Sequence, residues 1–358
     1  MRYRPLRRPV APDLIVDIGM SDGNDSQYYL EKGFRVFGVE ADPVMFRHVQ
    51  SRFATAREAG RIEIVNRAAA ATSDATVSFW RNETAQGLSS TTRNELDVYT
   101  AAQTEYAIPT INWPGVLTAS GLPYFCKIDI EGGEADFLAS MLEIGDRPTL
   151  ISVEAHSFAP IQALYDLGYR HFKVIDQNIF HTFPSLNPPL EGRYVAQPNW
   201  THASGPFGRE LQGHWIGFDE VKTIYVMIER LRTYRTVYWS WFDCHAWMPT
   251  EEADRVTCYL DGCTDKAVYG WAIYPNLPHL PVDMHVVVDG CFSETVCCAG
   301  PRPDVQRAGQ LSAAVGFNVA LPAFARPGAL VQLLDRFGNT IASNLGGVVA
   351  EAHRLTPG

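Results

Sequence analysis

Val16-Asp17-Ile18-Gly19-Met20-Ser21-Asp22-Gly23-Asn24-Asp25-Ser26 is the stretch that decides the fold of this chain. It joins an apolar run at 14–18, which has the length of a buried parallel strand, to a helical pattern that ends before Gly33. Glycines at such a strand-to-helix turn let the backbone approach a ligand closely. Ligands of open parallel sheets bind beyond the carboxyl ends of the strands. The stretch therefore predicts a ligand-binding turn at the edge of an α/β sheet.

The same alternation of strand and helix continues through the first half of the chain. Further strands are expected at 34–40, 62–65, 124–130, 150–154 and 172–176, and helices at 43–58, 134–142 and 161–167. Residues 76–80 predict an additional antiparallel strand, and Asp219 is expected to cap a helix at 220–234. Strands that alternate with helices predict a doubly wound, Rossmann-like parallel sheet.

The later part of the chain departs from this alternation. Residues 179–215 are rich in proline and glycine and are expected to form an insert or lid, because long loops in compact domains are usually functional. A polar linker is expected at 249–254. From 255 to 358, short strand-like runs are separated by turns such as Asp289-Gly290, which predicts a small all-β sandwich. We therefore predict a catalytic α/β domain at 1–248 and an accessory domain at 255–358.

Composition argues against several classes of protein. The 358 residues suggest two or three domains, and 46% hydrophobic with 20% charged residues is ordinary for a folded chain. The net charge of −10 argues against a nucleic-acid partner, which a basic face would attract. No apolar run approaches the ~18 residues of a membrane span, and no secretory signal follows the basic start. We expect a cytoplasmic protein whose seven cysteines are free thiols rather than zinc ligands.

Two motifs point to a cofactor. The glycines are spaced G-x-x-x-G rather than G-x-G-x-x-G, and Asp17 and Asp22 would repel a pyrophosphate but suit an ammonium group and hydroxyls. Glu40 lies at the end of the second strand, 21 residues after Gly19, where an acid can bind a ribose diol. Together the two motifs indicate S-adenosylmethionine. The alternative is a structural turn beside a surface acid.

A group of carboxylates and a histidine is expected at the ends of two other strands. Asp129 and Glu131 follow one strand, Glu154 and His156 follow the next, and residues two apart on a strand share a face. His156 is the natural general base because its ordinary pKa is near neutrality, with Asp129 or Glu131 orienting it. The alternative is a structural histidine. The set could also hold a divalent cation, but we do not favour one and predict no metal ligands.

Three segments in order carry a family resemblance: Val16-Asp17-Ile18-Gly19 with Asp22-Gly23, then Val39-Glu40-Ala41-Asp42-Pro43, then Lys127-Ile128-Asp129-Ile130-Glu131-Gly132-Gly133-Glu134. Over roughly residues 12–180 the chain resembles the FkbM family of S-adenosylmethionine-dependent methyltransferases. The resemblance implies transfer of a methyl group to an oxygen, often a hydroxyl of a sugar or of a polyketide-type product.

The resemblance also implies how the cofactor is held. The glycine turn would line its amino-acid end, Glu40 would hold the ribose, and Ala41, Asp42 and the segment at 68–69 would border the adenine. The expected cofactor-binding residues are Asp17, Gly19, Met20, Ser21, Asp22, Gly23, Ser26, Glu40, Ala41, Asp42, Ala68, Ala69 and Asp129.

The acceptor is expected to be a small molecule or glycan. Aromatic rings stack on sugar CH faces while polar groups bind the hydroxyls, so we expect Glu154, Phe207, Trp241 and His245 on the acceptor side. The alternative is that the aromatic residues form core.

The C-terminal part carries a second resemblance, in five segments: Leu260-Asp261-Gly262, Val268-Tyr269-Gly270-Trp271-Ala272, Val288-Asp289-Gly290, Arg302-Pro303-Asp304-Val305 and Gly316-Phe317. They resemble a β-rich module attached to bacterial polysaccharide glycosyltransferases. One interpretation is an assembly or spacer domain, with a glycosyltransferase or another polysaccharide-assembly protein as partner. A glycan-binding role would use Trp271 and Tyr274 as stacking faces. For the whole chain, the alternatives are an NAD-dependent nucleotide-sugar oxidoreductase or epimerase, and a non-catalytic glycan-binding protein.

Overall fold

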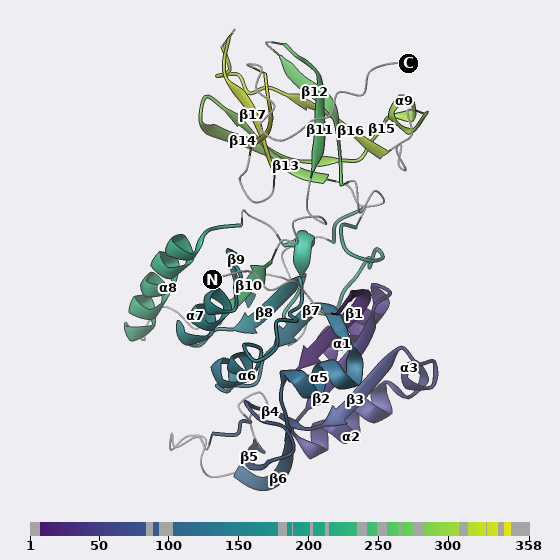
Figure 1. Ribbon diagram of the computed structural model, residues 1–358, viewed down its shortest axis with the longest axis vertical. Coiled ribbons are helices and arrows are strands. Elements are labelled where there is room, and N and C mark those ends of the chain that lie inside the picture. Colours follow the sequence, from purple (N-terminus) through teal and green to yellow (C-terminus); the bar gives the residue numbers. More distant parts are fainter. Residues whose placement is uncertain are drawn as a thin grey trace. The chain divides into compact units, whose positions relative to one another are not determined.

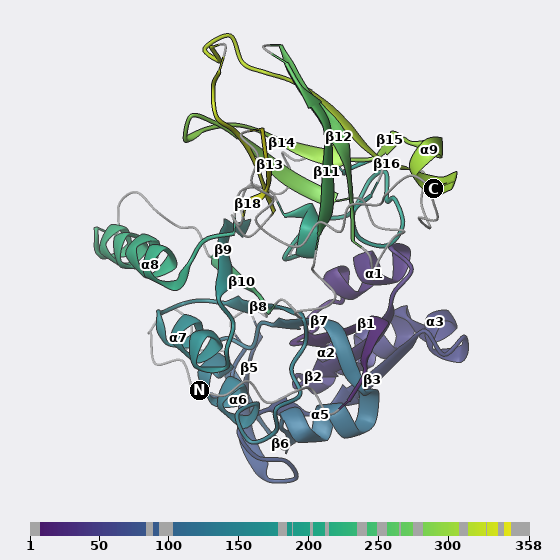
Figure 2. The same cartoon turned by 45° about the horizontal axis from the view of Figure 1, so that its top comes forward.

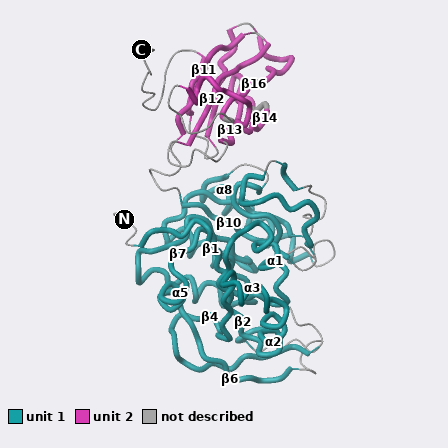
Figure 3. Tube along the Cα trace, turned by 90° about the vertical axis from the view of Figure 1, so that its right-hand side faces the viewer, with its two compact units in different colours: residues 1–248 teal, residues 249–358 magenta. Residues whose placement is uncertain are grey.

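The computed structural model describes most of the chain, and the structural statements below concern those residues alone. They are 8–83, 89–92, 103–177, 185–187, 189–200, 203–211, 215–234, 242–248, 256–264, 266–274, 282–307, 314–326, 328–335 and 340–344. The chain divides into two compact units, Met1–Met248 and Pro249–Gly358 (Figure 3). The linker expected at 249–254 lies outside the described residues.

A seven-stranded sheet forms the centre of the first unit (Figure 1), in the order β3-β2-β1-β7-β8-β10-β9. Its strands are β1 (Val10–Ile18), β2 (Arg35–Glu40), β3 (Ile62–Asn66), β7 (Leu122–Ile128), β8 (Leu150–Glu154), β9 (His171–Asp176) and β10 (Phe242–Trp247). The strands are parallel except β10, which pairs antiparallel with both β8 and β9. This confirms the predicted doubly wound α/β fold.

The order of the strands fixes where a ligand can bind. The chain runs outward from β1 through β2 to β3, then crosses back to place β7 beside β1 and continues to β8. Such a reversal leaves a crevice outside the carboxyl ends of the two central strands. The switch point therefore lies between Ile18 at the end of β1 and Ile128 at the end of β7, which are paired in register.

Helices connect the strands. They are α1 (Asn24–Glu31), α2 (Pro43–Arg52), α3 (Ala54–Glu58), α5 (Trp113–Ser120), α6 (Glu134–Ser140), α7 (Ala159–Asp166) and α8 (Phe218–Thr233). The single helix expected at 43–58 is wrong, because the helix breaks at Phe53. Asp219 is not the cap of α8: Gly217 holds that position, and Asp219 sits in the first turn, where its charge favours the helix dipole.

The two faces of the sheet are covered differently. Alternate residues of a strand point to opposite faces, and one face, which includes Val16 and Ile128, packs against α5, α6, α7 and α8 in a single apolar core. On the other face Phe125 meets Tyr29 of α1 and stacks on Phe207, with ring centroids 4.7 Å apart. The second face is therefore closed partly by the segment at 203–211 rather than by helices alone.

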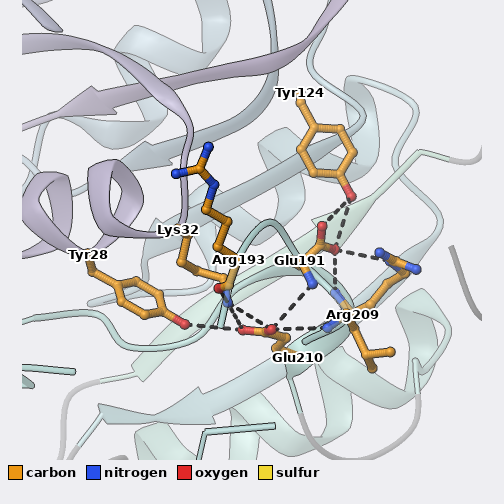
Figure 4. A network of polar contacts seen from close by, with 8 residues as sticks. Tyr28, Lys32, Tyr124, Glu191, Arg193, Arg209 and Glu210 are labelled. Atoms are coloured by element: carbon orange, nitrogen blue, oxygen red, sulfur yellow. Dashed lines mark hydrogen bonds and ion pairs between the residues drawn. The ribbon is translucent and has the colours of Figure 1, made fainter. Parts of the chain in front are cut away.

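The segment at 189–211 is tied to α1 and β7 by buried polar contacts (Figure 4). Lys32 Nζ donates to Glu210 Oε1 at 2.8 Å, and Tyr28 Oη donates to Glu210 Oε2 at 3.1 Å. Tyr124 Oη donates to Glu191 Oε1 at 3.0 Å, and the Glu191 carboxylate also accepts from the backbone N–H of Arg209. These contacts place the described part of the expected insert against the helix that follows the glycine turn.

A small three-stranded sheet, β4-β6-β5, follows β3. Its strands are β4 (Ala68–Ala69), β5 (Thr76–Asn82) and β6 (Gln103–Ile111). β5 pairs antiparallel with β6, which confirms the extra strand expected at 76–80. β4 comes directly after β3, so this sheet begins beside the carboxyl edge of the central sheet.

The second unit is built from two four-stranded sheets, β11-β12-β16-β15 and β14-β13-β17-β18. Its elements are β11 (Thr257–Cys263), β12 (Ala267–Ile273), β13 (Val282–Val288), β14 (Cys291–Cys298), β15 (Gly300–Pro301), α9 (Pro303–Arg307), β16 (Ala314–Ala320), β17 (Val331–Asp335) and β18 (Thr340–Ser343). β11 and β12 run side by side in both ribbon views (Figures 1 and 2). Apolar residues of both sheets, including Val268 and Val286, share one core, as in a sandwich.

The side chains expected to stack on a glycan, Trp271 and Tyr274, are both buried in this unit. Trp271 is 8% exposed and Tyr274 is 1% exposed, so neither presents a face to a glycan, and that reading of the two residues is wrong. The seven cysteines are all free thiols. No helix in the described part of the chain is long and apolar enough to cross a membrane.

Candidate active site

A cavity of about 960 Å³ opens at the carboxyl edge of the central sheet. Residues at the ends of β1, β2, β7 and β8 line it, together with residues of β4, β5 and the segment at 189–211. Ten of the predicted cofactor residues are among its lining: Gly19, Met20, Ser21, Asp22, Glu40, Ala41, Asp42, Ala68, Ala69 and Asp129. The cavity therefore lies where the strand order predicts a ligand.

Gly19 closes the end of β1 against β7. Its φ is +86°, and a Cβ built there would overlap the backbone carbonyl oxygen of Asp129. The Gly19 N–H donates to the carbonyl of Val39 at 2.9 Å, so the turn is fastened to β2 as well. Only glycine combines that conformation with so close an approach of two strand ends.

Glu40 is held by the backbone of two neighbouring turns. The N–H of Ser21 donates to its Oε2 and the N–H of Asp42 donates to its Oε1, each at 2.7 Å. A carboxylate has about four acceptor positions, so about two remain for a ligand on the cavity side. Burial raises the pKa of Glu40 to about 8, against the lowering effect of these two hydrogen bonds. Ser21 has a positive φ of 50°, a strained conformation that aims its N–H at this carboxylate.

Three predicted cofactor residues, Asp17, Gly23 and Ser26, support the turn and do not line the cavity. Asp17 is fully buried and accepts a hydrogen bond from Ser26 Oγ at 2.6 Å. Burial raises the pKa of Asp17 to about 7. Gly23 caps α1 with a φ of +85°. The Asp17–Ser26 hydrogen bond joins β1 to α1 behind the turn.

Lys127 is a buried cation that the sequence motifs did not single out as a site residue. Its Nζ lies 3.0 Å from Asp25 Oδ2, 3.2 Å from Asp129 Oδ2 and 4.0 Å from Asp17 Oδ1. The neighbouring carboxylates outweigh burial and raise its pKa, so the ammonium stays charged. One feature of the sequence could have identified Lys127 as a site residue: it is a lysine inside the strand at 124–128, which is otherwise apolar.

The second end of the cavity gathers Glu131, Glu154 and His156. His156 Nε2 lies 3.3 Å from Glu131 Oε2 and 3.0 Å from Glu154 Oε2. Hydrogen bonds to Glu131 and then Glu154 raise the pKa of His156 to about 11. The imidazole therefore already carries its proton near neutral pH, and His156 is not the free general base that the sequence predicted. The convergence of both strand ends, by contrast, is as expected.

The carboxylates at this end differ in their surroundings. Burial, and next the charge of Asp129, raise the pKa of Glu154 to about 9. Burial opposes ionisation of Asp129, but the Lys127 ammonium leaves its pKa lowered overall. Glu131 has a positive φ of 57°, uncommon for a residue with a side chain, and its carbonyl accepts from Ser90 Oγ at 2.8 Å. The loop after β7 is thus fixed in a strained form.

Two residues expected on the acceptor side lie in the core instead. Phe207 is 1% exposed and stacks on Phe125, and His245 is 2% exposed with its ring 6.5 Å from the same phenylalanine. Burial lowers the pKa of His245 to about 3, so it stays neutral. Neither lines the cavity; packing between sheet and insert accounts for both. Trp241 lies outside the described residues.

Several residues that line the cavity were missed by the sequence motifs. They are Asp25, Met45, Arg67, Phe79, Glu83, Ser89, Thr91, Gln177, Trp200, Ala203 and Ser204. Trp200 meets Tyr28 edge-on at 4.7 Å, and the N–H of Ser204 donates to Asp25 Oδ1 at 2.8 Å. The insert thus brings an aromatic ring to the cavity, at a position that only its packing on α1 reveals.

Acidic side chains outnumber cationic ones in the described lining, even when Glu40 and Glu154, whose pKa values are raised to about 8 and about 9, are counted as neutral. Its carboxylates are Asp22, Asp25, Glu40, Asp42, Glu83, Asp129, Glu131 and Glu154, and its cationic side chains are Arg67, Lys127 and His156. An anionic ligand would be repelled by this lining, whereas a cationic ligand or a donor of several hydroxyls is favoured.

Most of the sequence that forms this sheet and its cavity matches a known domain family. Residues 17–183 match the family model of the methyltransferase FkbM domain. The match covers just under half of the chain, and over these residues the chain is similar to that domain.

Similar solved structures are methyltransferases of low sequence identity. Precorrin-6y C5,15-methyltransferase from Geobacter metallireducens GS-15 aligns with 10% identity over 69% of this chain and 83% of its own, with a TM-score of 0.30. An rRNA methylase from Streptococcus thermophilus aligns with 10% identity over 67% of this chain and 89% of its own, with a TM-score of 0.30. The N-terminal domain of human METTL16 in complex with SAH aligns with 15% identity over 46% of this chain and 56% of its own, with a TM-score of 0.25. The chain therefore spans just over half the length of that domain. A search of curated protein sequences gave no match.

Proposed function

We propose that the first unit binds S-adenosylmethionine and transfers its methyl group to a hydroxyl oxygen of a sugar or glycan acceptor. The observation that carries the proposal is the Glu40 carboxylate, fixed by two backbone N–H groups beside the glycine turn, with acceptor positions left toward the cavity. An anchored carboxylate at the end of the second strand suits a ribose diol.

The residues present fit this cofactor. The small apolar side chains of Ala41, Ala68 and Ala69 and the ring of Phe79 offer a surface for an adenine near Glu40. The cofactor carries a sulfonium, an ammonium and one carboxylate, so its net charge is positive and complements the acidic lining. NAD, the alternative from the sequence, would bring two phosphates to the same carboxylates. The lining therefore favours the sulfonium cofactor.

The chain's own groups would prepare the acceptor. When bound, the sulfonium supplies an electrophilic methyl group, and the protein is left to align the hydroxyl and accept its proton. Asp129 faces the cavity and is paired with Lys127 at 3.2 Å, so it is a carboxylate placed to take that proton. His156 holds a proton between two carboxylates and acts as an orienting donor.

A hydroxyl-rich acceptor fits this end of the cavity. Carboxylate oxygens accept hydrogen bonds from hydroxyls, and Glu131 and Glu154 present two such groups within reach of one another. Trp200 adds an aromatic ring to the lining, on which the CH face of a sugar can stack.

The test is binding followed by product analysis with the full chain. Calorimetry with S-adenosylmethionine and with NAD should show binding of the first only, and Glu40→Ala should abolish it. The protein is then offered ¹³C-methyl-labelled cofactor with a panel of glycans and nucleotide sugars, and NMR should detect a new methyl ether. Binding of NAD alone would overturn the proposal, and binding of neither would favour a non-catalytic glycan-binding role.

A further inference from the structure

We propose that the second unit carries a carbohydrate-binding pocket on the sheet β11-β12-β16-β15 (Figure 1), formed around Tyr269, Asn318 and Arg302. The pocket has a volume of about 500 Å³ and lies wholly within this unit. Its ligand is a neutral glycan, with a sugar ring stacked on the tyrosine and its hydroxyls bound by the polar side chains. The pocket does not depend on the function proposed for the first unit, because no residue of that unit takes part.

Tyr269 supplies an aromatic face at the pocket. The core of the sandwich takes Val268 and Ala272 from β12, so the alternation of the strand turns Tyr269 to the outer face of the sheet, where it is 38% exposed. A Cβ built at Gly262 of the neighbouring strand would lie 2.5 Å from Tyr269 Oη and 2.6 Å from its Cζ. The ring therefore lies along the sheet, over a residue without a side chain, and its outer face can stack on the CH groups of a sugar.

An exposed amide lies beside this ring. Asn318 of β16 is the cross-strand partner of Tyr269 and lines the same pocket. Side chains of directly opposed residues stand about 4.5–5.5 Å apart at their Cβ atoms. The amide offers two donors and an acceptor, so it can bind hydroxyl groups at the edge of a sugar that is stacked on the tyrosine.

Arg302 is held in place at the pocket by two carboxylates. Its Nη1 donates to Asp261 Oδ2 at 2.5 Å, and its Nε and Nη2 donate to the two oxygens of Asp304 at 2.9 Å and 2.7 Å. Three of the five guanidinium N–H groups are used in this way, and the other two have no acceptor among the described residues. A side chain that is already ordered loses little freedom when it binds a ligand. These two N–H groups can therefore donate to sugar oxygens.

The balance of charge favours a neutral ligand. Asp261 and Arg302 are the charged residues of the described lining, and they are paired with each other. A phosphate or carboxylate would have to compete with two carboxylates for the same guanidinium, whereas hydroxyls can use the N–H groups that are left. Gly316 keeps room for this arrangement, because a Cβ there would lie 2.8 Å from Arg302 Cγ. One aromatic face, fixed donors and a paired charge together suit an uncharged sugar.

The test is saturation-transfer-difference NMR on the full chain with maltohexaose, cellohexaose, laminarihexaose and chitohexaose. At least one of the four should bind. Tyr269→Ala should weaken its binding about 10-fold or more, as truncation of a central aromatic contact commonly does. Tyr269→Phe should retain most of the affinity, because the ring face remains. Asn318→Ala should weaken binding about 2- to 10-fold, the effect of one hydrogen bond.

Tyr259→Ala is the matched control. Tyr259 is 50% exposed on the same sheet but does not line the pocket, so its loss should leave the affinity unchanged. Thermal unfolding of each variant shows that the second unit is intact, and Asn318→Ala decides the question if Tyr269→Ala does not fold.

Two results would overturn the pocket: binding of none of the four oligosaccharides, or binding that Tyr269→Ala and Asn318→Ala leave unchanged. Binding that is lost in Trp200→Ala instead would place the sugar in the cavity of the first unit. That result would overturn the second site and support the acceptor proposed for the first. Loss in Tyr269→Ala alone would uphold the pocket even if the first unit binds no S-adenosylmethionine.

Discussion

The two ends of the cavity are built by different means. At the end proposed for the nucleoside, which we call the nucleoside end, backbone N–H groups join the turn at Gly19–Ser21 to its neighbours, and that of Ser21 donates to the Glu40 carboxylate. At the end proposed for the acceptor, which we call the acceptor end, the side chain of Glu131, which follows β7, meets those of Glu154 and His156 at the end of β8. The first end is fixed by the conformation of a short turn, whereas the second depends on a balance of charges. Substitutions at the first end should therefore act through the backbone of the turn, and substitutions at the second end should act through the charges of its side chains.

Lys127 is the residue that links the two ends, and its loss should have the largest effect. It contacts Asp25 beneath the glycine turn and Asp129 at the acceptor end, and its side chain is 5% exposed. Removing one partner of a buried ion pair costs about 3–5 kcal/mol, because the remaining charges stay buried without compensation. We expect Lys127→Met to lower the free energy of unfolding by that amount in urea titrations followed by fluorescence.

The control for this prediction is an exposed ion pair. Arg35 and Asp13 are 47% and 54% exposed, and exposed pairs contribute about 0–1 kcal/mol. Arg35→Met should therefore change the free energy of unfolding by at most that amount. Equal urea midpoints for the two variants would show that Lys127 does not hold the two ends together.

Gly19→Ala tests the backbone construction of the nucleoside end alone. The left-handed conformation costs about 1–2 kcal/mol for a residue with a side chain, and overlap with the Asp129 carbonyl adds about 1–3 kcal/mol of overpacking. Thermal unfolding should show this loss, and calorimetry should show no binding of S-adenosylmethionine. Gly60→Ala is the matched control, since Gly60 also has a positive φ, +66°, but nothing within 4 Å of an added Cβ.

The sequence predicted that Gly19 and Glu40 lie together at the sheet edge, and the structure places both in the lining of the cavity. Their positions could be predicted because a turn and a strand end are local features, with spacing set by the length of one β-α-β unit. The role of His156 as a free base was predicted wrongly because Glu131, from the end of another strand, and the neighbouring Glu154 together keep its ring protonated. A motif identifies which groups converge, but the sign of each pKa shift depends on burial and on every neighbouring charge.

The prediction that Phe207 and His245 lie on the acceptor side was wrong for a related reason. Phe207 and His245 have the chemistry of a sugar site and equally that of a core, and only packing on Phe125 distinguishes the two. Strand β10 was missed because all six of its residues are buried on both faces, so it lacks the alternation of a half-buried strand. Trp200 reaches the cavity from an insert without periodicity, where sequence carries no positional signal.

Glu40→Gln should distinguish the two ends of the cavity by its effect on cofactor affinity rather than on the free energy of unfolding. The Glu40 carboxylate would accept hydrogen bonds from both ribose hydroxyls. Glutamine has one carbonyl oxygen, so if that oxygen keeps a backbone N–H of Ser21 or Asp42, the NH₂ group faces the ligand and one ligand hydrogen bond to a charged acceptor is lost. Such bonds contribute about 1.5–3 kcal/mol, which corresponds to roughly 10- to 150-fold weaker binding of S-adenosylmethionine. Glu131→Gln, at the acceptor end, should leave this affinity within about threefold. If calorimetry shows that Glu131→Gln weakens binding of S-adenosylmethionine more than Glu40→Gln does, the roles proposed for the two ends are the wrong way round.

The smallest expected effect is a pH dependence of cofactor affinity that belongs to Glu40. Burial raises its pKa to about 8 from an ordinary 4.5, and the carboxylates of Asp42 and Asp17 add to the rise. Hydroxyl and N–H donors favour the ionised form, so binding below pH 8 must release the proton. Affinity should therefore rise by up to about tenfold per unit of pH toward 8, then level off. Calorimetry in buffers of different ionisation enthalpy measures the released proton, and Glu40→Gln should remove this contribution.

The same group makes a linked prediction for stability. Between about 4.5 and 8 the folded chain holds a proton on Glu40 that the unfolded chain has lost, so the free energy of unfolding falls as pH rises through that window. Asp17 and Asp243, with pKa values raised to about 7 and about 8, act in the same direction. The informative quantity is therefore the difference between wild type and Glu40→Gln, which should show a flatter fall over that window in urea titrations. Parallel curves would mean that Glu40 is ionised throughout, held by its two backbone hydrogen bonds, and the nucleoside end would then be preorganised for a ribose at every physiological pH.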